Sequence, residues 1–102
     1  MKIYFERTGG FAGIRMAATV NTESLSPEQA RELRDTLDAA AFFDLPARIE
    51  SPALEADRFR YKLTVEAEGR RHTVEVGEAA VPEALRPLLQ HLMAAARSAS
   101  RQ

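Results

Sequence analysis

The side chains best suited to chemistry in this 102-residue chain are two histidines, His72 and His91. A zinc-peptidase helix would place two histidines in the pattern His-Glu-x-x-His, which does not occur here. The chain has no cysteine, which removes thiolate metal sites, cysteine nucleophiles and disulfides. The motif Gly9-Gly10-x-x-Gly13 does not open a helix, so it does not form a phosphate-binding loop. The sequence therefore predicts a protein that is not an enzyme and has no cofactor or metal.

The positions of the two histidines favour structural roles. His72 has the inward register of a predicted strand, which indicates a residue that packs or hydrogen-bonds in the core. His91 lies off the apolar stripe of the last predicted helix and is expected in solvent. Carboxylates are frequent between residues 44 and 57, but no spacing pairs two of them for acid–base chemistry. Function is therefore expected to rest on binding.

The most distinctive short segment is Gly9-Gly10-Phe11-Ala12-Gly13. Glycine adopts positive φ angles without steric cost, so this segment predicts a turn between two strands. Phe11 is a large apolar ring among small residues. Its ring either folds back onto the edge of the core or projects outward as an anchor for a partner. Local physics favours the first alternative and leaves the second open.

The least regular segment covers residues 44–57. It holds four acidic residues and one arginine, which give it a net charge of −3. A loop of this length is unusual in a small domain and is often functional. The alternative is a solvated connection that only spans the molecule.

The elements that position these segments follow from hydrophobic periodicity. Alternating residues predict strands, and apolar residues three and four apart predict helices. Ser26 and Gln29 fit a capping box at the start of the first helix, with Pro27 at its first position. Glu68-Gly69 predicts a tight turn between the last two strands. The predicted order is ββαββα, with strands at 3–8, 14–20, 58–66 and 71–76 and helices at 27–41 and from about residue 87.

This order predicts an α+β fold with a four-stranded antiparallel sheet and two helices packed on one face. Residues 1–97 are expected to form one domain, and residues 98–102 are expected to be a frayed tail. If each helix returns antiparallel to the preceding strand, segments 9–13, 44–57 and 77–81 share one end of the sheet. That end is a candidate binding edge.

Charge and hydropathy limit the classes of partner that the protein is expected to bind. The net charge of −1 gives no overall attraction to nucleic acid or anionic lipid. The N-terminus runs directly into an alternating strand, without an apolar run typical of a signal peptide or membrane span, so a cytoplasmic protein without a membrane partner is expected. An alternative is a binding module that uses the open sheet face for nucleic acid or another protein. That face carries Tyr4 and the basic side chains Arg15, Arg58, Arg60, Lys62 and Arg71, but also Glu6, Glu66 and Glu75.

Four segments resemble the emfourin family of small bacterial inhibitors of protealysin and related thermolysin-like zinc metallopeptidases. The segment at 5–14, Phe-Glu-Arg-Thr-Gly-Gly-Phe-Ala-Gly-Ile, resembles the N-terminal signature of the family and is the most specific. The others are Phe-Phe-Asp-Leu-Pro-Ala at 42–47, Ala-Asp-Arg-Phe-Arg-Tyr at 56–61 and Val-Pro-Glu-Ala-Leu-Arg-Pro-Leu at 81–88. The resemblance covers roughly residues 2–93.

The resemblance implies inhibition of a cytoplasmic thermolysin-like protease whose active-site cleft is blocked. It raises the outward role of Phe11, which would suit the apolar pocket of such enzymes, to equal standing with core closure. A carboxylate of Glu50, Glu55 or Asp57, or a loop carbonyl, could reach the protease zinc. Clamping of the cleft rims is the favoured alternative, because no motif points at a metal. The residues inferred to bind the protease are Gly9, Gly10, Phe11, Ala12, Gly13, Glu50, Ser51, Pro52, Glu55 and Asp57.

Overall fold

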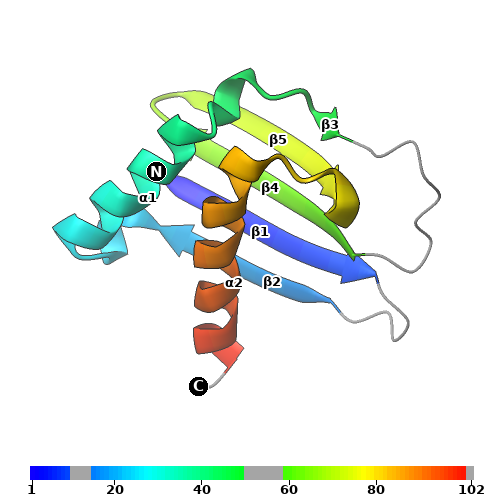
Figure 1. The fold of residues 1–102 in the computed structure, drawn as a ribbon. Helices are drawn as coiled ribbons and strands as arrows, with labels where there is room; N and C mark the ends of the chain where they lie inside the picture. Colours follow the sequence, from blue (N-terminus) through cyan, green and yellow to red (C-terminus); the bar gives the residue numbers. More distant parts are fainter. Residues whose placement is uncertain (10–14, 50–58, 101–102) are drawn as a thin grey trace.

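The fold is organised by a five-stranded mixed sheet, seen in a computed structural model that describes residues 1–9, 15–49 and 59–100 (Figure 1). The strands lie in the order β2-β1-β4-β5-β3. All neighbours are antiparallel except β3, which is parallel to β5. The strand bounds are β1 Lys2–Gly9, β2 Met16–Asn21, β3 Arg48–Ile49, β4 Phe59–Ala67 and β5 Arg70–Gly77.

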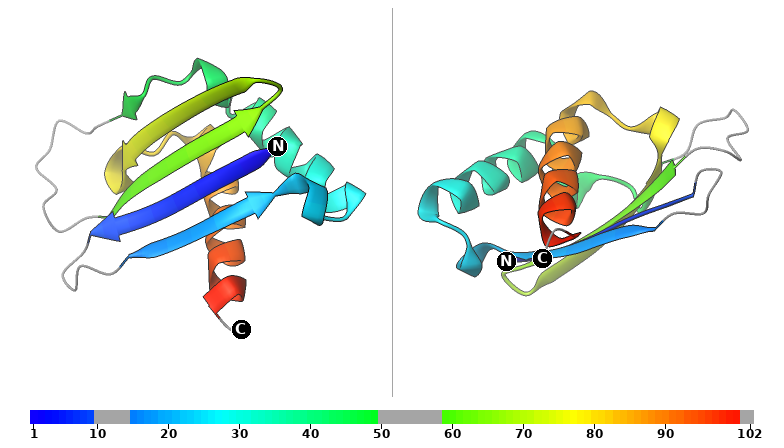
Figure 2. Two further views of the ribbon diagram at one scale, coloured as in Figure 1. Left: turned by 180° about the vertical axis from the view of Figure 1, so that it is seen from behind. Right: turned by 90° about the horizontal axis from the view of Figure 1, so that it is seen from below.

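Two helices cover one side of this sheet, which we call the helix face. They are α1, Pro27–Ala39, and α2, Arg86–Ser100, and both lie on the same side (Figure 2). The capping box forms as predicted, because the Gln29 amide donates to Ser26 Oγ at 3.1 Å and the Ser26 amide donates to Gln29 Oε1 at 3.3 Å. The other side of the sheet is the open face. The predicted α+β class, with two helices on one face, is confirmed.

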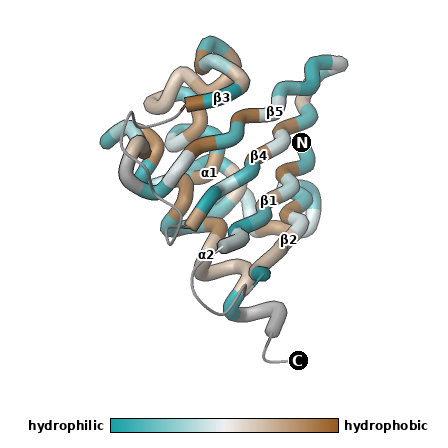
Figure 3. The backbone as a smooth tube through the Cα atoms, turned by 90° about the vertical axis from the view of Figure 1, so that its right-hand side faces the viewer, coloured by the Kyte–Doolittle hydropathy of each residue, from teal (hydrophilic) through white to brown (hydrophobic). Residues whose placement is uncertain are grey.

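The core lies between the helix face and the two helices. Apolar and polar residues alternate along the strands, as the tube in Figure 3 shows, so each strand presents its apolar side chains to the helices. The buried strand residues meet buried helical leucines, and Phe42 is only 1% exposed. The core from the sheet comprises Ile3, Phe5, Tyr61, Leu63, Val65, Val74 and Val76, and the helical segments add Leu33, Leu37, Leu85, Leu88, Leu89 and Leu92.

The prediction of a four-stranded antiparallel sheet is wrong in detail, because β3 adds a short parallel strand inside the predicted 44–57 loop. The chain after α1 reaches the sheet beside the start of β5, where the Leu45 carbonyl lies 2.7 Å from His72 Nε2. It then runs along β5 in the same direction, and the Glu75 amide donates to the Ala47 carbonyl at 2.8 Å. The observed order is therefore ββαβββα.

The first helix ends two residues before the predicted boundary. Ala41 has a left-handed backbone with φ of 49°, which stops the α-helix and turns the chain into a short 3-10 helix, η2, Phe42–Asp44. This turn places the Phe42 ring against the His72 ring, with 5.5 Å between centroids.

The predicted tight turn at Glu68 and Gly69 is confirmed, with φ angles of 52° and 76°. The last helix continues to Ser100.

Candidate functional site

One end of the sheet gathers the residues that flank both predicted binding segments. Gly9 pairs with Phe59, and Ile49 of β3 lies opposite Val76, next to Gly77. Arg15 precedes β2 at the same end, because Met16 pairs with Arg7. We call this end the loop edge, defined by Gly9, Arg15, Ile49, Phe59 and Gly77. The chain leaves and re-enters the sheet here on both sides of residues 10–14 and 50–58, and Gly77 leads into the short helix η3, Glu78–Ala80.

The structure describes one of the predicted protease-binding residues, Gly9. Its φ of 106° is an angle that residues with a side chain rarely adopt, which explains why glycine stands where β1 ends. The predicted turn is thus supported at its first residue. The other predicted residues lie outside the described residues: Gly10, Phe11, Ala12, Gly13, Glu50, Ser51, Pro52, Glu55 and Asp57.

The loop edge is tied to α2 by a contact among three side chains, which we call the Arg7 clasp: Arg7, Phe59 and Met93. The Arg7 guanidinium carbon lies 4.2 Å from the centre of the Phe59 ring, and Arg7 Nη1 donates to Met93 Sδ at 3.5 Å. Phe59 stands directly opposite Gly9, which has no side chain to compete for the space. The clasp therefore joins the last third of β1, the first residue of β4 and the middle of α2.

No local pattern in the sequence singles out the Arg7 clasp. Arg7 has the inward register of β1, two residues after Phe5, where an apolar residue is expected. An arginine at an inward position beside a glycine turn was the available signal. Its partner Phe59 lies far along the chain, so their contact becomes visible only once β1 and β4 are paired.

Two hollows lie at opposite ends of the molecule. One, of about 340 Å³, is beside the clasp, between α2 and the start of η3, and is lined by Tyr61, Glu78, Val81, Arg86, Leu89, Gln90 and Met93. The other, of about 590 Å³, lies at the Glu68–Gly69 end, far from the loop edge. At that end Arg70 stacks over Phe43, with 4.3 Å between the guanidinium carbon and the ring centre. The same type of stack therefore occurs at both ends of the sheet.

The histidines have the structural roles that the sequence predicted. His72 packs between the Phe42 and Phe43 rings and hydrogen-bonds the Leu45 carbonyl. His91 is exposed on α2, with Nε2 3.9 Å from Glu32 Oε1 of α1. Among the described residues, no group of three histidine or acidic side chains could hold a metal ion. Neither histidine lies at the loop edge.

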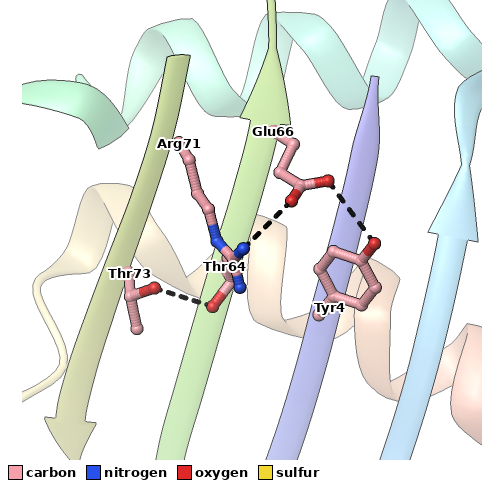
Figure 4. Close-up of polar contacts among 5 residues, drawn as sticks. All are labelled: Tyr4, Thr64, Glu66, Arg71 and Thr73. Atoms are coloured by element: carbon pink, nitrogen blue, oxygen red, sulfur yellow. Dashed lines mark hydrogen bonds and ion pairs between the residues drawn. The ribbon is translucent and has the colours of Figure 1, made fainter. Parts of the chain in front are cut away.

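Opposite charges lie side by side on the open face. Figure 4 shows Glu66 between Arg71, whose Nη1 lies 3.4 Å away, and Tyr4, whose hydroxyl donates to Glu66 at 3.4 Å. Arg15 Nη2 lies 2.8 Å from Glu6 Oε2. Such pairs lower the positive potential that binding to a phosphate backbone requires. The described part of this face therefore has the charge pattern of a solvated sheet, and Arg58 lies outside it.

Comparison with protein families shows which family the chain belongs to. The family model for emfourin matches residues 5–93. The chain belongs to the emfourin family. Membership implies a metalloprotease-inhibitor role in general, with a protease as the partner. No curated protein and no solved structure matches the chain.

The match to the emfourin family includes every residue of the Arg7 clasp and both sides of the loop edge. It begins in β1 and ends in α2 at Met93, so the clasp spans the matched region from near its start to its last residue. Emfourins are inhibitors, which agrees with the prediction that the chain is not an enzyme. Within the described residues, no helix combines the length and the apolar character needed to cross a membrane.

Proposed function

We propose that this protein inhibits a thermolysin-like zinc metalloprotease of the protealysin type by inserting the loop edge into the active-site cleft. The observation that carries the proposal is the convergence of Gly9, Arg15, Ile49, Phe59 and Gly77 at one end of a sheet whose sequence matches an inhibitor family. A cleft accepts a narrow projection more readily than a flat surface. The end of a sheet is narrower than its faces, and both predicted binding segments join the sheet at this end.

Rigidity at the base of the loop edge supports the same proposal. An inhibitor whose binding segments leave a fixed scaffold loses less entropy on association than a flexible peptide does. Gly9 and Phe59 are held by the β1–β4 ladder, and Phe59 is also held by Arg7. A scaffold that stays folded also resists cleavage by the enzyme that it blocks.

The proposed contacts come from the two segments predicted by the sequence. Phe11 fills the apolar pocket that thermolysin-like enzymes use for large hydrophobic side chains. Its small neighbours Gly9, Gly10, Ala12 and Gly13 allow the backbone to approach the cleft wall. The second segment contacts the opposite rim through Glu50, Ser51, Pro52, Glu55 and Asp57. The partner in this proposal is a cytoplasmic protease.

The protease zinc need not be touched. Catalytic zinc in such enzymes has three protein ligands and one open position, which a carboxylate can occupy. Three carboxylates in the second segment have this chemistry, namely Glu50, Glu55 and Asp57. No pattern in the sequence directs one of them to a metal, so we propose that the protein clamps the rims and denies access to substrate.

Titration against a protealysin-type protease tests both parts of the proposal. The protein is expected to abolish cleavage of a chromogenic peptide at submicromolar concentration. A variant that combines Glu50→Ala, Glu55→Ala and Asp57→Ala is expected to keep its inhibition constant within about threefold, because single ion pairs at the rim of an interface contribute little.

Two results would count against this account. Absence of inhibition by the wild-type protein at micromolar concentration would refute the inhibitor role against this protease type. Loss of inhibition by about 100-fold or more in the combined variant would instead support direct zinc ligation, because a metal ligand contributes far more than a rim contact.

A further inference from the structure

The strand β2 leaves one long edge of the sheet open. Among the described residues it pairs only with β1, along its full length of six residues. Its sequence, Met-Ala-Ala-Thr-Val-Asn, has no charged residue and no proline. Proteins usually protect such edges with charges, prolines or very short strands. The opposite edge has that protection, because β3 is only two residues long.

The hydrogen-bonding groups that β2 presents outward follow from its register. The Thr22 amide donates to the Met1 carbonyl at 3.0 Å, so the pair of Thr22 and Met1 is of the hydrogen-bonded type. Hydrogen-bonded and non-hydrogen-bonded pairs alternate along an antiparallel ladder. Therefore Ala17, Thr19 and Asn21 direct their backbone N–H and C=O groups away from β1, toward the open side.

The two ends of β2 differ in shape and in charge, so that each end suits the other end of a second copy. Beside Val20, a hollow of about 210 Å³ opens on the helix face, lined by Val20, Leu25, Leu33, Leu92, Ala95, Gln29, Glu32 and His91. At the other end Met16 lies half-buried on that same face. Charges at the two ends are also opposite. The Arg15 side chain is 68% exposed and also pairs with Glu6 of its own sheet, and Glu23, just past the strand, is exposed.

We propose that β2 pairs antiparallel with β2 of a second copy, around a two-fold axis at Ala18, so that one continuous sheet runs through both copies. In this register Ala17 exchanges backbone hydrogen bonds with Thr19 of the second copy. Met16 lies opposite Val20 of the second copy, next to the apolar hollow. Arg15 lies opposite Asn21 of the second copy, two residues from Glu23 of that copy. A two-fold axis places each end of β2 beside the opposite end of β2 in the second copy. Both complementary contacts therefore form at once.

The position of α2 is compatible with this register. The helix passes over β2 and continues beyond it (Figure 1). Leu92 and Ala95 line the hollow together with Val20, so α2 crosses β2 on the Asn21 side of Ala18. A two-fold axis at Ala18 therefore sets the two α2 helices side by side rather than on top of each other. The loop edges lie at the outer ends of the joined strands, so both stay accessible.

Sedimentation equilibrium of the full chain, with a Thr19→Pro variant, tests the pairing. Proline removes an outward N–H without removing any hydrogen bond to β1, and edge strands accept proline at such positions. We expect wild-type protein to dimerise below about 1 mM. Thr19→Pro is expected to raise the dimer dissociation constant at least tenfold, because the two-fold symmetry removes two bonds. The matched control Thr19→Ala keeps the N–H and is expected to stay within about twofold.

Charge exchange gives a second test that leaves the backbone unchanged. Arg15→Glu and Glu23→Arg are each expected to raise the dissociation constant about fivefold, because each places like charges near one another in both halves of the dimer. The double variant restores opposite charges and is expected to recover wild-type association. A wild-type protein that is monomeric at about 1 mM would overturn the proposal, as would a dimer that neither Thr19→Pro nor the single charge variants weaken.

Discussion

Replacement of Phe11 by alanine is expected to weaken inhibition of a protealysin-type metalloprotease about 100-fold and to leave the fold intact. A large ring that fills a partner's pocket is the usual form of an interface anchor, and its truncation costs about 2–4 kcal/mol of binding free energy. The neighbours of Phe11 are glycine and alanine, which contribute little side-chain contact of their own. The ring therefore carries most of the apolar contact that segment 9–13 can make.

The matched control for Phe11→Ala is Tyr4→Ala. Tyr4 is an aromatic residue that is 37% exposed on the open face, away from the loop edge, so its loss is expected to leave inhibition unchanged. An unaltered inhibition constant in Phe11→Ala would remove the anchor role. A fall of about 3–5 kcal/mol in the free energy of unfolding would show instead that the ring closes the core, since a buried phenylalanine costs that much.

Replacement of Arg7 by alanine is expected to weaken inhibition about tenfold, although Arg7 itself makes no proposed contact with the protease. Its guanidinium holds Phe59 opposite Gly9, so its loss frees the ring at the point where both binding segments join the sheet. A guanidinium stacked on a ring contributes about 0.5–2 kcal/mol. Greater freedom at the base of the segments appears as an added entropy cost on binding.

The protein contains a natural control for this experiment. Arg70 stacks on Phe43 at 4.3 Å, almost the geometry of Arg7 on Phe59, but at the opposite end of the sheet. Arg70→Ala is expected to lower thermal stability as much as Arg7→Ala does and to leave inhibition unchanged. Arg7→Lys is expected to recover part of the inhibition, because it restores the charge without the planar stack. Equal losses of inhibition in Arg7→Ala and Arg70→Ala would reduce the clasp to a stability effect.

The four longer strands could be predicted from sequence because their side chains report directly on burial. In β4 the inward residues Tyr61, Leu63 and Val65 are all buried, with polar residues between them. The start of α1 was equally predictable from the sequence, because the side chains of Ser26 and Gln29 each hydrogen-bond the backbone amide of the other within one turn. In both cases the signal and the structure that it specifies lie within a few neighbouring residues.

The fifth strand could not be predicted in this way. Arg48 and Ile49 are too few to show alternation, and β3 is held by backbone hydrogen bonds that any residue can make. Its position depends on where Ala41 ends α1, since a left-handed alanine is not a turn that composition predicts. Along that path Phe42 packs against His72, which is a contact between residues far apart in the sequence.

The site was only partly predictable for the same reason. Gly9 is visible in the sequence because a positive φ angle requires it. Arg7 was not, because its role depends on Phe59 and Met93, which reach it through strand pairing and helix packing. Local patterns indicate where a chain bends, and long-range pairs determine how firmly that bend is held.

The central claim is that the loop edge is the surface that meets the protease, and amide NMR of the labelled protein with one equivalent of protealysin-type protease tests it most directly. The claim predicts that the signals of Gly9, Arg15, Phe59 and Gly77 shift or broaden on binding, while those of Glu68 and Gly69 at the opposite turn stay in place. Unchanged signals at the loop edge, with perturbation confined to the Glu68–Gly69 turn or to the open face, would contradict it.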